Sequence, residues 1–217
     1  MELDHGSTDQ VVECPYQGHA SIRFKTPEGN VVYVDPYDKV KKGYEETADV
    51  ILITDMRHPD HNCVNHVRYR SEDCKIITPS DVLKGLEHKT VYLGYLQIES
   101  VEAGYNALHD VRYCVGYILT FSNGVTVYIS GDTAHTPQMP ELASRNLDYA
   151  FFCCDGIYTM TVLEAKRAAE MVQAKHSIPY HMSISKLFDE KIAERFNTEG
   201  AMIMKNDETF RMKNAKH

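Results

Sequence analysis

The feature that most constrains the fold is the apolar run at residues 50–54, which is followed at once by the polar segment 55–61. A short, uninterrupted apolar run is typical of a strand that is buried on both faces. Such a strand needs a packed layer on each side, so the chain is expected to fold into layers of sheet and helix. The run also predicts a rigid strand that delivers a loop rich in histidine and aspartate.

Other segments predict a mixed α/β or α+β domain. Strands are expected at residues 20–25, 31–34, 116–121, 125–129 and 149–154. Asn123-Gly124 is a strong hairpin signal between two of them. Thr161 and Glu164 form a capping box that predicts the start of a helix, and its apolar stripe contains Ala165, Ala168, Ala169 and Val172. A second amphipathic segment is expected at residues 185–196.

Composition and charge exclude several classes of protein. The chain has 217 residues, 31 acidic and 23 basic, with a formal net charge of −8, which argues against nucleic-acid binding and against an anionic membrane surface. No apolar run approaches the roughly 20 residues of a membrane span, and the first ten residues lack a signal-peptide pattern. We therefore expect a cytoplasmic protein with one domain over residues 1–217. Its six cysteines are expected to be reduced thiols, several of them buried on strands.

Eleven histidines in a chain without tryptophan direct attention to metal chemistry, because histidine is the commonest metal ligand. The polar segment 55–61 contains His58, Asp60 and His61. In an extended loop His58 and Asp60 point the same way and His61 points elsewhere, so the three can address two neighbouring points. A two-metal site requires that arrangement, and a solvated polar loop is the alternative.

Three further segments end in residues of the same kinds. Asp132 follows a tight turn at Gly131, His181 ends the short apolar segment 178–180, and His109 precedes the strand expected at residues 116–121. Each segment alone is a weak signal. A carboxylate fixed by a glycine turn is well suited to bridge two metal ions.

Taken in order, these segments resemble the metallo-β-lactamase superfamily, in particular small bacterial metal-dependent hydrolases similar to the L-ascorbate-6-phosphate lactonases. The parallels follow one another along most of the chain: Gly18-His19-Ala20-Ser21, Val34-Asp35-Pro36-Tyr37, the apolar run with its histidine-rich loop, Tyr105-Asn106 with His109, Gly131-Asp132-Thr133, Tyr158-Thr159-Met160-Thr161 and Ile178-Pro179-Tyr180-His181. The resemblance implies an α+β fold, an αββα sandwich of two mixed sheets covered by helices. It places the metal site at one edge of the sheets.

The resemblance also implies a ligand set, in which one expected histidine is missing. The family motif is His-x-His-x-Asp-His, and its first position falls on Met56, or on Asp55 if one residue is inserted. The carried-over metal ligands are His58, Asp60, His61, His109, Asp132 and His181, with Asp55 as a further candidate. Asp132 would be shared between a complete second site and a first site that lacks one imidazole.

The expected function is that of a metal-dependent hydrolase with a weakened first metal site. Imidazole and carboxylate ligands suit one or two divalent ions, with zinc or manganese favoured and iron compatible. A metal-activated water would attack a small ester, lactone or phosphodiester, with Asp60 as the catalytic group that orients the water and assists proton transfer. Arg57 beside the loop is compatible with an anionic substrate, although a solvated arginine is the simpler interpretation.

Two alternatives and the oligomeric state stay open at this point. The missing histidine is compatible with a degenerate family member that binds a ligand or partner without turnover. An RNA-processing nuclease is disfavoured by the net charge and by the lack of room for a substrate-binding domain. His135, three residues after Asp132, is a further candidate for the pocket. The remaining histidines need no function: His5, His19, His66, His88, His176 and His217.

Overall fold

The apolar run forms an inner strand of a sheet in the computed structural model, which describes residues 10–206 and 208–214. Strand β4 (Ala48–Leu52) pairs in parallel with β3 (Val31–Val34) on one side and β5 (Arg70–Ile77) on the other. Val50 and Leu52 face the core between the two sheets, whereas Ile51 and Ile53 face an outer cluster. The prediction of a strand buried on both faces is therefore confirmed.

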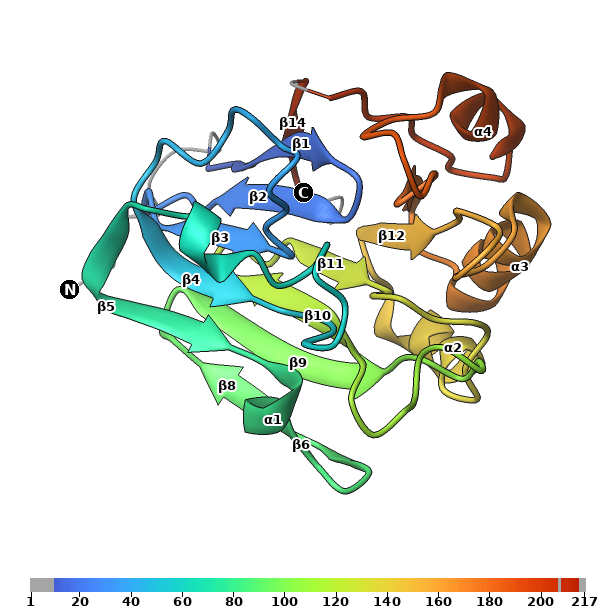
Figure 1. Cartoon of the computed structure of the whole chain (residues 1–217), viewed down its shortest axis with the longest axis horizontal. Coiled ribbons are helices and arrows are strands. Elements are labelled where there is room, and N and C mark those ends of the chain that lie inside the picture. The colour runs from blue at the N-terminus through green and yellow to red at the C-terminus, as the bar shows by residue number, and fades with distance from the viewer. Residues whose placement is uncertain (1–9, 207, 215–217) are drawn as a thin grey trace, which may run out of the picture.

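Two six-stranded mixed sheets make up the body of the molecule (Figure 1). In the first sheet, β14 (Thr209–Met212), β1 (Val12–Gly18) and β2 (Ser21–Lys25) precede β3, β4 and β5. The second sheet has the order β13 (His176–Tyr180), β12 (Tyr149–Cys153), β11 (Thr126–Ile129), β10 (Val115–Phe121), β9 (Leu96–Glu102) and β8 (Thr90–Tyr92). The pairs β3–β4–β5 and β11–β12–β13 are parallel, and the other neighbours are antiparallel.

The helices are short and lie at the periphery. They are α1 (Pro79–Val82), α2 (Met139–Leu142), α3 (Val162–Val172) and α4 (Glu190–Arg195), with the 3₁₀ turns η1 (Val64–His66) and η2 (Ala143–Arg145). A small hairpin joins β6 (Leu83–Lys84) and β7 (Glu87–His88). Helix α3 packs against β12 and α2, and Figure 1 shows α2, α3 and α4 together on the right. The α+β sandwich expected from the sequence is confirmed.

Apolar packing between the sheets fixes their relative position. Phe24 of the first sheet lies 5.6 Å from Phe121 and 6.3 Å from Phe151 of the second sheet, measured between ring centroids. A second cluster covers the opposite face of the first sheet with side chains from irregular segments, among them Tyr37, Val40 and Tyr44. That outer layer is therefore built mainly from loops and η1.

Most predicted elements are present, but one helix is shorter than expected. Helix α3 begins at the predicted capping box. The second amphipathic segment forms a helix only over α4, so the expectation for residues 185–189 was wrong. Asp189 caps the helix by accepting a hydrogen bond from the amide of Ile192 (3.3 Å). The preceding chain turns away to the end of β1, where the Leu187 carbonyl accepts from the amide of His19 (2.6 Å).

The carboxyl ends of the parallel strands of both sheets meet at one edge. The amide of Val115 donates to the carbonyl of Thr54 (3.0 Å), and the hydroxyl of Tyr117 donates to the carbonyl of Ile53 (2.8 Å). Gly131 follows β11 with a φ of +62°, and a Cβ there would lie 2.6 Å from the Val115 carbonyl oxygen. Glycine is needed because no side chain fits this contact, and it places Asp132 directly at the junction of the two sheets.

Two further expectations concern thiols and membranes. All six cysteines are free, and Cys14 and Cys153 are buried on strands as predicted. Among the helices of the described part of the chain, none is long and apolar enough to cross a bilayer.

The capping box of α3 provides a test of the fold. The Thr161 hydroxyl accepts from the Glu164 amide (3.3 Å), and the Glu164 carboxylate accepts from the Thr161 amide (2.7 Å). Thr161→Ala should lower the free energy of unfolding by about 1 kcal/mol, because it leaves helix amides without a capping partner. Chemical denaturation measures this. Glu170→Ala, on the exposed face of the same helix, is the control and should change stability by a few tenths of a kcal/mol at most, about the difference in helix propensity. Equal effects of the two substitutions would contradict the assignment.

Candidate metal centre

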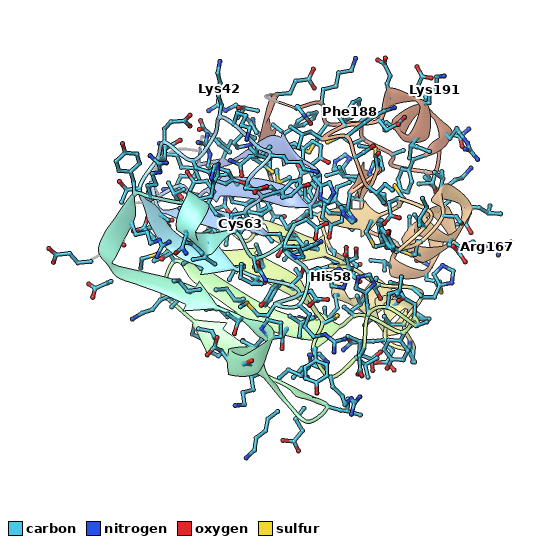
Figure 2. The ribbon with its side chains drawn as sticks, viewed as in Figure 1. Lys42, His58, Cys63, Arg167, Phe188 and Lys191 are labelled. Carbon is cyan, nitrogen blue, oxygen red and sulfur yellow. The ribbon has the colours of Figure 1, made fainter. Side chains whose placement is uncertain are left out.

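The candidate ligands lie at the carboxyl edge shared by the two sheets. His58, Asp60 and His61 follow β4, Asp132 follows β11, and His181 follows β13. In open α/β sheets, ligand sites likewise lie outside the carboxyl ends of the strands. Figure 2 shows His58 near the middle of the molecule, where the ends of the two sheets meet.

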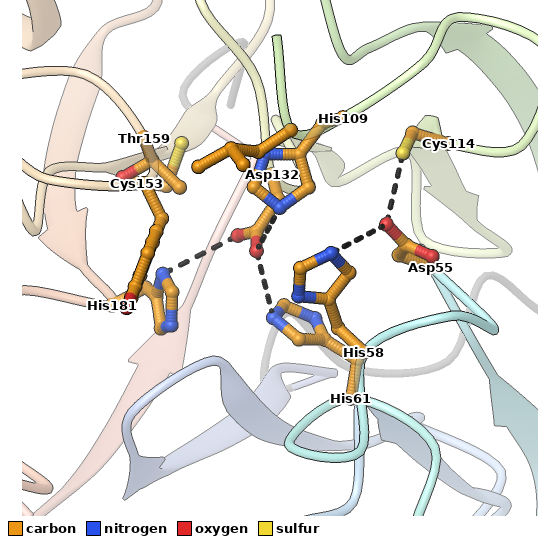
Figure 3. A network of polar contacts seen from close by, with 12 residues as sticks. Asp55, His58, His61, His109, Cys114, Asp132, Cys153, Thr159 and His181 are labelled. Carbon is orange, nitrogen blue, oxygen red and sulfur yellow. Dashed lines mark hydrogen bonds and ion pairs between the residues drawn. The ribbon is translucent and has the colours of Figure 1, made fainter. Parts of the chain in front are cut away.

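Asp132 is the centre of the cluster (Figure 3). Its Oδ2 lies 3.1 Å from His61 Nε2 and 3.3 Å from His109 Nε2, and its Oδ1 lies 3.3 Å from His181 Nδ1. All four side chains are buried. The structure thus brings together four of the six metal ligands expected from the sequence.

Asp35 fixes the orientation of His61 from behind. Its Oδ2 lies 3.0 Å from His61 Nδ1. The same carboxylate accepts hydrogen bonds from the amide (2.8 Å) and the hydroxyl (2.7 Å) of Thr54. A carboxylate on Nδ1 leaves Nε2 of the imidazole facing Asp132, the arrangement by which proteins orient metal-binding histidines. The sequence showed Asp35 as part of a turn motif, but its role in the site was missed.

A second cluster contains Asp55, His58 and His109. Their ligand atoms lie close enough together to hold one metal ion. Asp55 Oδ2 is 3.9 Å from His58 Nε2, and the rings of His58 and His109 have centroids 4.6 Å apart. The Asp55 side chain is fully buried, whereas Met56 is 44% exposed. Of the two sequence alignments of this loop, the structure therefore favours the one that puts Asp55 in the position of the missing histidine.

Asp60 lies apart from Asp132 and faces a third cluster. Its Oδ2 is 3.7 Å from His181 Nε2 and 3.7 Å from His19 Nε2, and its side chain is 29% exposed. The rings of His19 and His181 meet edge to face with centroids 4.0 Å apart. His19, Asp60 and His181 also satisfy the distance requirement for one metal ion. His181 thus belongs to two of the three clusters, one through each ring nitrogen.

The backbone is strained where the site is built. His19, Asp35 and His181 have φ values of 56°, 45° and 46°, in the left-handed region that non-glycine residues rarely adopt. Each of these residues directly follows the last residue of a strand. Strain of this kind persists only where surrounding contacts hold it, and it concentrates at functional sites.

The nitrogen and oxygen atoms of the central cluster that could coordinate a metal fit a cation. Within the described residues, His61 Nε2, Asp132 Oδ1 and both ring nitrogens of His109 and His181 are buried without a hydrogen-bond partner of acceptable geometry. Buried polar atoms normally have partners, because leaving them without one costs about 1–3 kcal/mol each. Several such nitrogens directed at one carboxylate are the arrangement that a metal ion satisfies.

The neighbouring charges favour the charged forms of His61 and Asp132 despite their burial, whereas His19 stays neutral. Burial lowers the pKa of His61, but Asp132 and Asp35 outweigh it and raise the pKa well above its usual value. Burial likewise opposes the ionised form of Asp132, but His61 and His181 hold its pKa well below the usual value. The pKa of His19 falls to about 3, because burial and the neighbouring His181 and His61 disfavour its protonation. Asp132 is thus a carboxylate and His19 a neutral imidazole.

Asp155 is a second residue that sequence reasoning missed. Its side chain is fully buried, and its Oδ2 lies 3.5 Å from His181 Nδ1. It accepts hydrogen bonds from the amides of Ile157 and Tyr158 (2.7 Å each) and from the hydroxyl of Thr159 (2.6 Å). Asp155 therefore shapes the loop that carries Tyr158 while it faces a candidate ligand. An aspartate directly before a glycine resembles an ordinary turn residue in the sequence.

An open pocket of about 600 Å³ gives access to the clusters. His58 and Asp60 contribute to its wall, and Tyr37, Lys39 and Tyr158 lie around them. Arg57 is not among the lining residues, because its guanidinium stacks 4.4 Å from the ring centroid of Tyr113. The positively charged side chain that lines this pocket is therefore that of Lys39 and not that of Arg57, which the sequence suggested.

The other histidines of the described residues lie outside the three clusters. His135 was expected as a candidate for the pocket, but its Nε2 contacts the Glu164 carbonyl of α3 (2.7 Å) and it belongs to none of the three clusters. His176 stacks on Tyr149, and His66 contacts the Val40 carbonyl. His5 and His217 lie outside the described residues.

Comparisons by sequence and by structure identify relatives of this chain. The family described as "Beta-lactamase superfamily domain" matches residues 13–181. A metal-dependent hydrolase of Bacillus velezensis is 29% identical over 192 residues, which cover 76% of this chain and 83% of the relative. A crystal structure from Parabacteroides distasonis, described as a metal-dependent hydrolase, has a TM-score of 0.73 at 28% identity and covers 90% of this chain and 93% of that chain. A metallo hydrolase of the archaeon Ignicoccus hospitalis shares the fold with a TM-score of 0.72 at 20% identity, over 94% and 99% of the two chains.

The matched residues make up most of the chain and include every candidate ligand. The chain therefore belongs to the beta-lactamase superfamily, and its two mixed sheets form the metallo-β-lactamase fold that the sequence resemblance implied.

Proposed function

We propose that the chain is a metal-dependent hydrolase that binds divalent cations on both sides of Asp132. The observation that carries this proposal is the group of buried, unpartnered imidazole nitrogens directed at one buried carboxylate. The names of the relatives, which are metal-dependent hydrolases, support it. Zinc and manganese suit this mixture of imidazole and carboxylate, and iron is compatible with it.

Two cation sites follow from the three clusters. The inner site would use His61, Asp132 and His181. Asp60, which the sequence resemblance implied as a ligand, faces the opposite ring nitrogen of His181 and would act from the wall of the pocket. The outer site would use His58 and His109, with Asp55 in place of the missing imidazole. A carboxylate oxygen replaces a nitrogen there, so we expect the outer site to bind zinc more weakly than the inner one.

The reaction requires a cation, a proton acceptor and a substrate pocket. A bound divalent cation would lower the pKa of a coordinated water and polarise the substrate oxygen. Asp60 is the acceptor best placed to orient the attacking water and take its proton at Oδ2, because its carboxylate is partly exposed in the wall of the pocket. His19 and Asp155 would hold His181 in place, and Asp35 would hold His61.

The pocket favours a small substrate with an anionic group. Lys39 stands at the pocket with its ammonium 5.4 Å from the ring centroid of Tyr37, and Tyr158 lies on the loop fixed by Asp155. A cation beside aromatic walls suits an ester, lactone or phosphodiester that carries negative charge. The phosphorylated-lactone class rests on the subgroup resemblance of the sequence.

Metal removal tests the proposed reaction. Purified protein stripped with a chelator should lose hydrolysis of a nitrophenyl ester or a bis-nitrophenyl phosphodiester, because no group would remain to activate water near pH 7. Added manganese or zinc should restore it. Elemental analysis of the purified protein before stripping should find at least one tightly bound ion per chain. Hydrolysis that persists without metal would contradict the proposal, and bound metal without turnover would favour a ligand-binding protein.

Asp35 provides a test of the inner site. Asp35→Asn removes the negative charge behind His61, and loss of such a partner typically weakens metal binding about 10–100-fold. Calorimetric titration of the stripped protein with zinc measures this affinity. The matched control is Asp148→Asn, since Asp148 is also buried and accepts from the amide (2.9 Å) and hydroxyl (3.1 Å) of one threonine, Thr126, away from the site. Equal zinc affinity in the Asp35 variant and wild type would refute the role of Asp35.

A further inference from the structure

Two donors from the chain hold the Asp55 carboxylate. The amide of Arg57 donates to Oδ1 (2.7 Å), and the thiol of Cys114 donates to Oδ2 (3.0 Å). The side chains of Asp55 and Cys114 are both fully buried. Figure 3 shows the Cys114 sulfur and His58 on either side of the same carboxylate oxygen.

The backbone keeps Cys114 beside Asp55. Asp55 and Cys114 form an isolated antiparallel β-bridge, although they are 59 positions apart in the sequence. The next pair along this contact is the hydrogen bond from the Val115 amide to the Thr54 carbonyl (3.0 Å). Cys114 is therefore held at Asp55 by the same contact that joins the two sheets.

Cys114 differs from the other cysteines in what its thiol contacts. Cys63, Cys153 and Cys154 donate to backbone carbonyls, at 2.9, 3.6 and 3.7 Å. The Cys114 thiol instead donates to the carboxylate oxygen that lies 3.9 Å from His58 Nε2. One lone pair of this oxygen is occupied by the thiol, so the other is free to face His58 and His109.

We propose that Cys114 is a positioning residue for the outer metal site: its S–H holds Asp55 in the one orientation that directs Oδ2 toward His58 and His109. This inference rests on the proposed function, in which Asp55 is a ligand of the outer site. The thiol keeps its proton and acts through Asp55. It thereby compensates for a carboxylate side chain shorter than the histidine that it replaces.

Cobalt(II) titration of stripped, full-length protein tests this role. Absorption of the bound ion and calorimetry together distinguish the two sites. Cys114→Ala should weaken the outer site about 10–100-fold, the usual cost of losing a partner of a metal ligand, and leave the inner site unchanged. Cys114→Ser, which retains an O–H donor, should restore most of the affinity. Cys14→Ala is the matched control, because Cys14 is equally buried in the core of β1.

Each remaining outcome decides the question. Unchanged outer-site affinity in Cys114→Ala would overturn the proposal, as would loss of both sites together, which would show a general structural role. An intense near-ultraviolet sulfur-to-cobalt charge-transfer band in the wild type, absent from Cys114→Ser, would show that the thiol is itself a ligand and would also overturn it. Asp55→Asn distinguishes the ligand role of Asp55 from the positioning role of Cys114. If it leaves the outer site intact, the ligand role of Asp55 in the proposed function fails. If it weakens the outer site while Cys114→Ala does not, only the role of Cys114 fails.

Discussion

The contact on which the arrangement of the site loops depends is the buried Asp132 carboxylate among three imidazoles. Each imidazole comes from a different segment, and His61 and His181 follow strands of opposite sheets. Burying a charge costs several kcal/mol unless partners surround it. Asp35 offsets part of that cost by holding His61 from behind. The loops at this edge therefore cannot take their positions independently, because each one satisfies a charge presented by another.

The sequence predicted what is local and missed what depends on distant contacts. Residues 50–54, the hairpin turn at Asn123-Gly124 and the capping box of α3 each carry their signal within a few neighbouring residues, and the structure contains all three elements. Asp35 and Asp155 act on histidines far along the chain, so nothing beside them in the sequence marks that role. The helix expected from residue 185 is shortened by a bond to the end of β1.

The ambiguity at the missing histidine shows the same limit. Asp55 and Met56 are neighbours, and the sequence alone allows either to take the ligand position. The bridge from Asp55 to Cys114, 59 positions away, distinguishes the two side chains, since Asp55 is buried and Met56 is 44% exposed. A pairing between two sheets settles which residue faces inward, and no local periodicity contains that information.

The pairing of β14 with β1 has a consequence for how the protein is made. Strand β1 precedes every candidate ligand in the sequence, and its partner β14 follows all of them. During synthesis on the ribosome, the edge of β1 that pairs with β14 therefore stays unpaired until residues 209–212 emerge. His181 is also held by a bond from its amide to the His19 carbonyl at the end of β1. The candidate ligand set is therefore incomplete in the nascent chain until His181 has emerged, because every other candidate ligand precedes it.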